Sequence, residues 1–205
     1  MTTDNAAPEL TPELTPALVR AHALQVARRC LRIGWFVNAL NPLLVTTPRP
    51  VEAIAALLDA IVAEGWQIRQ SLWPEAEGSA NRAAALRGLL RVKDEGFTTL
   101  RKGLAADTAH VDLRLDGFGK TLPGPLKVYD AAQHDRARAA GTVPPHFFII
   151  RENRYVYMQM DINVQALCAE IDDLILRVQG LDKGAKKAVE EMHDSFSYAA
   201  RKPKR

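Results

Sequence analysis

The stretch HFFIIRENRYVYMQMD, residues 146–161, decides the fold class of this chain. Two runs of bulky side chains flank the dipeptide Glu152-Asn153, and asparagine tolerates the positive φ that a tight turn requires. The stretch therefore predicts a β-hairpin, in a chain whose other periodic segments are mostly helical.

Two helices are predicted after the hairpin. Apolar residues recur at helical spacing over residues 164–178, and Gly180 ends this pattern. Either Asp161 or Asn163 is expected to cap the first turn, because a short polar side chain can accept an unpaired backbone N–H there. Asp182 then starts a last amphipathic helix.

Three helices are predicted before the hairpin. The first covers residues 15–41, with Thr15 as its N-cap and Pro42 as its stop, since proline cannot donate the backbone hydrogen bond of a helix interior. A second helix begins near residue 50, and a third covers residues 79–104.

Past residue 105 the apolar period changes from about 3.6 to 2. Val111, Leu113 and Leu115 alternate with polar residues, which predicts a strand, and a short helix ending at Gly141 is expected within residues 126–140. The predicted fold class is therefore α+β and predominantly helical. It has an N-terminal three-helix region, a small antiparallel sheet made of the strand and the hairpin, and two C-terminal helices.

The predicted organisation is a single α+β domain over residues 15–200. Residues 1–14 hold two prolines and three acids without apolar periodicity, so they are expected to form a flexible N-terminal arm. Within the domain, residues 15–105 are the helical part and residues 106–200 contain the strand, the hairpin and the last two helices. Residues 201–205, RKPKR, form a basic tail.

The composition is that of an ordinary globular domain, with 205 residues, 47% hydrophobic and 25% charged. A formal net charge of +3 is too small to mark a dedicated nucleic-acid domain, although 18 Arg stand against 9 Lys. Cys30 and Cys168 occupy distant apolar helical positions, which predicts buried free thiols. Neither a signal-peptide pattern nor a membrane-spanning stretch is found, so a cytoplasmic protein without membrane contact is expected.

No cofactor or metal motif in the sequence is complete. Gly119-Lys120-Thr121 copies the end of a phosphate-binding loop, but Arg114 stands where its first glycine is required. The five histidines lack metal-ligand spacing, so neither a metal nor a cofactor is expected. A metal-dependent or histidine-dependent enzyme of unknown reaction is the third hypothesis, and its candidate residues are His134, His146, Asp112 and Glu152.

The second hypothesis is a nucleic-acid-binding protein. Arginines share much of one side of the first predicted helix, and the third predicted helix has a comparable basic side. These sides and the basic tail could contact a phosphate backbone. The residues concerned are Arg28, Arg29, Arg32, Arg87, Arg91, Arg201, Lys202, Lys204 and Arg205.

The leading hypothesis is a non-enzymatic protein that binds a partner macromolecule, above all another protein. Both faces of the hairpin carry bulky side chains, so the face with Tyr155, Tyr157 and Gln159 needs a cover from the N-terminal helices or from another chain. Trp73 is also a candidate binding residue, because its own helix buries it less easily.

Trp35 and Trp66 are predicted to pack in the core, because both fall within or beside apolar stripes. A homodimer is the simplest assembly for such a protein, since two-fold dimers are the commonest soluble oligomers. A bacterial origin is inferred from the composition, and a regulatory, immunity-type or mobile-element accessory role would suit the chain.

Overall fold

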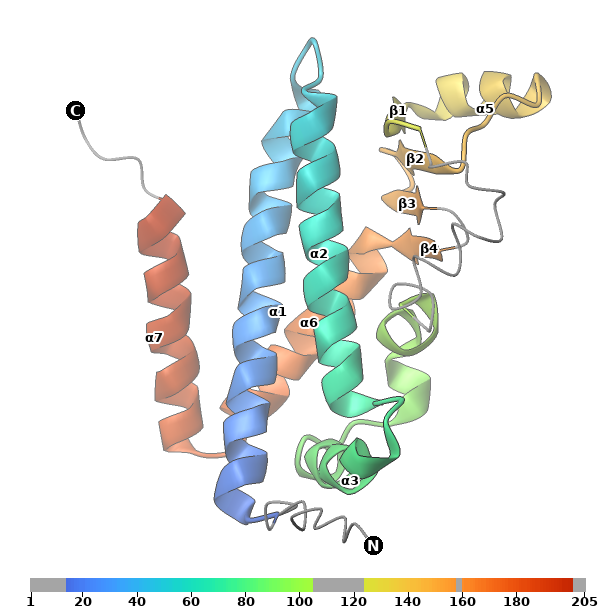
Figure 1. Cartoon of the computed structure of the whole chain (residues 1–205). Helices are drawn as coiled ribbons and strands as arrows, with labels where there is room; N and C mark the ends of the chain where they lie inside the picture. The colour runs from blue at the N-terminus through green and yellow to red at the C-terminus, as the bar shows by residue number, and fades with distance from the viewer. Residues whose placement is uncertain (1–13, 105–123, 158–159, 201–205) are drawn as a thin grey trace, which may run out of the picture.

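The computed structural model describes residues 14–104, 124–157 and 160–200 (Figure 1). The α-helices are α1 (Pro16–Val45), α2 (Val51–Leu72), α3 (Ala80–Leu89), α5 (Ala131–Ala139), α6 (Val164–Gln179) and α7 (Lys183–Ala200). Short 3-10 or π-helical turns are η1 (Glu77–Ser79), η2 (Asp94–Gly96) and η3 (Thr99–Gly103). The strands are β1 (Lys127–Tyr129), β2 (His146–Ile149), β3 (Arg154–Tyr157) and β4 (Met160–Asn163). This element order confirms the predominantly helical α+β fold.

The two longest helices form the centre of the fold. α1 and α2 lie side by side, and α6 crosses behind them (Figure 1). α7 packs on the outer side of α1, whereas the sheet and α5 lie beyond α2 in the same view. α1 is therefore enclosed between α7 on one side and α2 on the other.

α1 begins where the sequence predicts but ends later. The hydroxyl of Thr15 accepts the N–H of Leu18 at 3.2 Å, as an N-cap should. The prediction that Pro42 ends the helix is wrong, because Pro42 lies inside α1. Proline removes one backbone hydrogen bond, yet Leu40 and Leu44 are both buried one turn apart, and this packing keeps the last turn helical.

α3 is shorter than the predicted third helix. It ends at Leu89, and Arg91 then takes a positive φ of 52°, while the N–H of Val92 bonds the carbonyl of Arg87 at 2.9 Å. The prediction of one helix to residue 104 is therefore wrong. The apolar residues at helical spacing are still buried, but they reach the core from η2 and η3 as separate short turns.

The two C-terminal helices start as predicted. Of the two caps predicted for α6, Asn163 is the one used, because its side-chain oxygen accepts the N–H of Ala166 at 2.8 Å, whereas Asp161 lies in β4. Gly180 is the C-cap of α6. The carboxylate of Asp182 accepts the N–H of Ala185 at 2.7 Å in the first turn of α7. These capping residues could be identified from the sequence because capping is a local interaction.

α6 also holds η3 in place through Glu170, a partly buried residue that the sequence pattern does not mark. Glu170 accepts the backbone N–H groups of Thr99 at 2.7 Å and Leu100 at 2.8 Å. Because the acceptor is ionised, both are charge-assisted hydrogen bonds, which are stronger than neutral ones. They hold the irregular turn against a regular helix.

The sheet has the order β1-β2-β3-β4 and is mixed. β2 and β3 form the predicted hairpin, with Asn153 at a positive φ of 49° in the turn. The expected second strand over residues 154–160 is instead two strands, since β4 pairs antiparallel with β3. β1 pairs parallel with β2, so the prediction of a purely antiparallel sheet is wrong. The expected short helix is α5, which follows β1 in the chain. The predicted strand at residues 111–115 lies outside the described residues.

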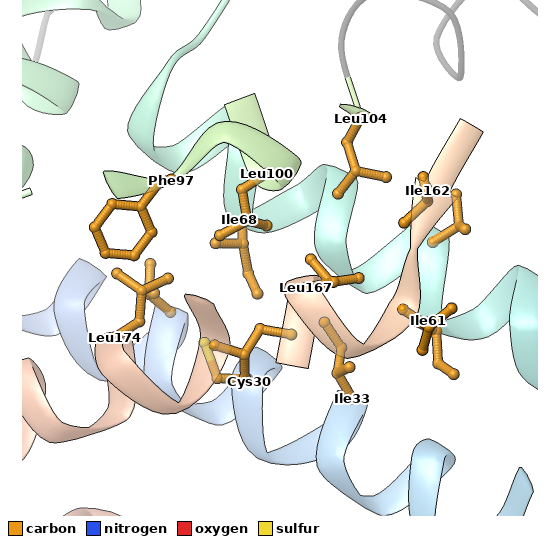
Figure 2. Packing of buried hydrophobic residues seen from close by; sticks show 14 of the residues in the cluster. Cys30, Ile33, Ile61, Ile68, Phe97, Leu100, Leu104, Ile162, Leu167 and Leu174 are labelled. Carbon is orange, nitrogen blue, oxygen red and sulfur yellow. The ribbon is translucent and has the colours of Figure 1, made fainter. Parts of the chain in front are cut away.

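The main core lies where α1, α2 and α6 meet η3 and β4. Figure 2 shows side chains from all five elements packed there, among them Ile33, Ile61 and Leu167. Cys30 belongs to this core, as predicted, whereas Cys168 is only partly buried. Burial raises the pKa of both thiols, which disfavours their reactive thiolate forms.

Replacing Arg91 by glycine is expected to stabilise the fold. An L-residue at positive φ is strained, and glycine relieves that strain at some cost in unfolded-state entropy, so Arg91→Gly should raise the free energy of unfolding by about 0.5–1 kcal/mol. Urea denaturation followed by circular dichroism measures the change. Arg91→Ala, which keeps the strain, is the control and should show no comparable gain.

Candidate functional site

Tyr155, a predicted binding residue, is fixed inside the protein. It is 1% exposed, and its hydroxyl donates to a carboxylate oxygen of Asp59 on α2 at 2.7 Å. The N-terminal helices, rather than another chain, therefore cover this face of the hairpin at Tyr155. Burial, and then the charge of Asp59, raise the pKa of the Tyr155 hydroxyl.

His146 extends this polar contact toward β1. Its Nε2 lies 3.1 Å from the Tyr155 hydroxyl oxygen, and its Nδ1 lies 3.2 Å from the carbonyl oxygen of Gly124. Because the Tyr155 hydroxyl donates to Asp59, its oxygen can accept a hydrogen bond from Nε2 of His146. His146 thus ties the loop before β1 to α2 through Tyr155.

The other predicted binding residues do not gather at one place. Trp73, at the end of α2, is partly buried, and its indole N–H donates to Asp94 at 2.9 Å. Tyr157, on β3, is partly buried and meets the His146 ring edge-on at 4.9 Å. Gln159 lies outside the described residues.

Most of the described candidate arginines for nucleic-acid binding make contacts within the chain. Arg29 and Arg32 each donate to Glu64 at 2.8 Å, so one carboxylate partly neutralises both. Arg87 donates to the carbonyl oxygen of Leu72. Of the predicted set, two described members are exposed, Arg28 and Arg91. The tail members Arg201, Lys202, Lys204 and Arg205 lie outside the described residues.

The described candidate enzyme residues come from different elements, with His134 on α5, His146 on β2 and Glu152 in the turn between β2 and β3. His134 is buried and stacks on Phe147 at 5.4 Å, whereas Glu152 is exposed in the turn between β2 and β3. Asp112 lies outside the described residues. Within the described ranges, no group of three or more His, Cys, Asp or Glu side chains is arranged to hold a metal ion.

A large groove lies between α1, α6 and α7. Its volume is about 1270 Å³, and its apolar lining includes Leu31 and Trp35 from α1, Ile175 from α6, and Val189 and Phe196 from α7. Trp35 is 37% exposed, which corrects the prediction that it packs fully in the core. This groove is larger than the cleft between α2 and the sheet, whose volume is about 580 Å³.

An exposed ion pair joins α7 to α1 close to the start of α7. Arg20 of α1 binds Asp182 through two hydrogen bonds of 2.8 and 2.9 Å, just before α7 begins. Arg20 also holds the pKa of the Asp182 carboxyl below its ordinary value. In Figure 1, α7 and α1 diverge toward the C-terminal ends of both helices. α6 crosses behind α1 and contributes Asp172, Ile175 and Gln179 to the lining of the groove.

The charged residues of the groove are acidic. Asp172 from α6 and Glu190 and Asp194 from α7 lie in its lining, which contains no Lys or Arg among the described residues. His193 also lines the groove and lies 3.8 Å from Asp194. The groove therefore combines apolar walls with negative charge, in a chain whose formal net charge is positive.

A second, smaller cleft lies between α2 and the sheet. Its volume is about 580 Å³, and its lining includes Asp59 and Trp66 of α2, Arg29 of α1, Tyr157 of β3 and Met160 of β4. The indole nitrogen of Trp66 is buried without a hydrogen-bond acceptor from the described residues.

The sequence contains a pattern that indicates the groove, a second row of apolar residues on the first helix. Leu31, Trp35 and Ala39 are spaced four residues apart and form a second apolar ridge on α1, beside the main stripe. A helix with two apolar sides needs cover on both.

The chain matches no protein-family model, no curated protein and no solved structure. Among the described residues, no helix combines the length and the apolar character that a bilayer crossing requires.

Replacing Tyr155 by phenylalanine should destabilise the fold. The change leaves the buried Nε2 of His146 without its partner, so we expect a loss of about 1–3 kcal/mol in the free energy of unfolding. Chemical denaturation measures it. Tyr129→Phe, at a partly buried tyrosine of β1, is the matched control and should change stability by less than about 0.5 kcal/mol.

Proposed function

We propose that this protein binds another protein, which inserts a basic amphipathic helix into the groove between α1, α6 and α7. The observation that carries the proposal is the pairing of exposed apolar walls with acidic residues in one large hollow. Small-molecule pockets are typically about 300–1000 Å³, so a groove of about 1270 Å³ favours a larger occupant.

The length of the groove suits a helix. Along α1 it extends from Cys30 to Pro42, which at about 1.5 Å per residue is roughly 18 Å, or more than three helical turns. Helix-binding grooves typically take apolar residues spaced i, i+3, i+4 and i+7. Trp35 is the expected central contact, because tryptophan is enriched among the residues that dominate binding energy.

Charge favours a foreign basic partner over a second copy of this chain. A two-fold dimer through the groove would bring Asp172, Glu190 and Asp194 of both copies close together, and like charges across an interface are costly. Residues 1–14 are also a poor occupant, since they hold three acids and no Lys or Arg. A homodimer through the groove is thus an outcome for experiment to exclude.

The same acids disfavour nucleic acid as an occupant, because phosphates would be repelled. A cytoplasmic location, and a regulatory, immunity-type or mobile-element role, stay predictions from the sequence.

A pair of synthetic peptides tests the proposal. One is an amphipathic helix of about 14 residues with leucines on one face and lysines flanking them, and its twin has glutamate in place of every lysine. The lysine peptide should bind at least tenfold more tightly at low salt in isothermal titration calorimetry, and the Trp35→Ala variant should lose about tenfold or more of that affinity.

Val45→Ala is the control for this variant, because Val45 is 83% exposed on α1 and does not line the groove. Circular dichroism checks that both variants fold. Equal binding of the two peptides would contradict the proposal. So would a dimer in sedimentation velocity that Trp35→Ala dissociates.

Charge reversal in the groove should reverse the peptide preference. With Glu190→Lys and Asp194→Lys combined, the glutamate peptide should bind more tightly than the lysine peptide, and the difference should shrink as salt shortens the screening length. Glu191→Lys, on α7 but outside the groove lining, is the control and should leave the order unchanged. An unchanged order in the double variant would place the peptide elsewhere.

A further inference from the structure

α1 contains a glycine that packing inside the chain does not require. Gly34 lies in the interior of α1, where glycine destabilises a helix relative to alanine because it loses more backbone freedom on folding. Its φ is not positive, and a β-carbon added to it would have no atom of another element within 4 Å. Alanine would therefore fit at this position and would favour the helix.

Gly65 of α2 is different, because its neighbours do oppose a side chain. A β-carbon at Gly65 would lie 2.7 Å from the side chain of Leu104, which is buried in the core. Gly34 is exposed and has no such neighbour. Glycine at residue 34 therefore needs an explanation other than the packing of the described residues against one another.

Gly34 lies in the wall of the groove between α1, α6 and α7. On a helix surface, four residues spaced i, i+3, i+4 and i+7 surround one hole, which receives a single side chain of a facing helix. Four lining residues of α1 have this spacing, namely Leu31, Gly34, Trp35 and Asn38. Because Gly34 has no side chain, the hole between the four residues is deep, and we call it the Gly34 notch.

The Gly34 notch suits a large aromatic side chain. Leu31 and Trp35 give it two apolar sides, and the α1 residues in the groove lining carry no charge. An aromatic ring suits the position beside Trp35, because pairs of aromatic rings gain more than the burial of their area alone. The acids of the groove come from α6 and α7, which leaves the α1 wall to an apolar anchor.

We infer that Gly34 determines which partner helix the groove accepts, because the notch takes one large aromatic side chain from the middle of that helix. The inference rests on the proposed function and names the kind of residue that anchors the partner. Glycine lowers the stability of α1 and at the same time gives the notch its depth. Such a loss of stability at a functional site is a common trade-off in proteins.

Two peptides and one substitution test the inference on the full chain. Both peptides match the lysine peptide of the proposed function, except that the central apolar residue is phenylalanine in one and alanine in the other. In isothermal titration calorimetry, the phenylalanine peptide should bind the wild type at least about tenfold more tightly, because its ring is buried. Gly34→Leu fills the notch, so the ratio of the two affinities should fall below about threefold.

Gly88→Leu is the matched control. Gly88 of α3 is also an exposed helical glycine whose added β-carbon would have no atom within 4 Å, but it does not line the groove. The control should leave the affinity ratio at its wild-type value. Both substitutions introduce a better helix former, so both should raise the urea midpoint of unfolding. Gly34→Ala should shift both readings in the same directions by less, and it tests the inference if Gly34→Leu fails to fold.

The outcomes separate this inference from the proposed function. If the lysine peptides bind and depend on Trp35, but the affinity ratio is the same in Gly34→Leu as in the wild type, the inference is overturned and the proposed function stands. Equal binding of the phenylalanine and alanine peptides to the wild type overturns the inference in the same way. If neither peptide binds the wild type, both the proposed function and the inference fall.

Discussion

α1 carries more apolar surface than α2 and α6 can cover, and the rest of the structure follows from this constraint. Its main stripe, which includes Val26, Cys30 and Ile33, is buried against those two helices. Its second ridge, with Leu31 and Trp35, faces the other way. α7 covers that ridge incompletely, because the two helices separate from the joint between Arg20 and Asp182 (Figure 1). The groove is the part of α1 that its neighbours leave uncovered.

The opposite side of α1 is held by polar contacts. Glu64 of α2 forms ion pairs with both Arg29 and Arg32 of α1, and these pairs link the two long helices where they pack together. The sheet is then anchored to α2 where Tyr155 reaches Asp59. These partly buried contacts set the spacing between α1, α2 and the sheet, and the smaller cleft occupies the space between them. The smaller cleft and the groove thus lie on different sides of α1, with Arg29 lining the cleft and Leu31 and Trp35 lining the groove.

Local interactions could be predicted from the sequence, and nonlocal ones could not. Thr15 and Gly180 are caps as predicted, and Asn163 is one of the two caps predicted for α6, because a cap depends on its immediate neighbours. α1 continues past Pro42 because the burial of Leu40 and Leu44 by other elements outweighs the local cost of proline. The parallel pairing of β1 with β2 has no local signature in a three-residue strand.

The same contrast between local and nonlocal interactions applies to the candidate site. Periodicity shows that the Trp35 side of α1 is apolar, but it does not show how much of that side a neighbouring helix covers. The sequence therefore predicts that Trp35 packs in the core, although 37% of it is exposed. It predicts that Tyr155 lies on a binding face, although Tyr155 is buried and bonded to α2, because the tertiary arrangement decides which hairpin face meets the helices. An amphipathic pattern predicts that a cover exists, and the packing decides what provides it.

The net charge of the chain differs in sign from the charged residues that line the groove. Arginine exceeds lysine by 18 to 9, and the chain is positive overall. Many of these arginines are paired within the chain, as Arg20 is with Asp182, Arg154 with Asp161 and Arg177 with Asp173. Planar guanidinium groups suit such bidentate or shared contacts. Part of the arginine excess is therefore taken up by ion pairs within the chain, and Glu190 of the groove lining lies 3.9 Å from Lys186. The three acids that line the groove therefore lie in a chain whose formal net charge is positive.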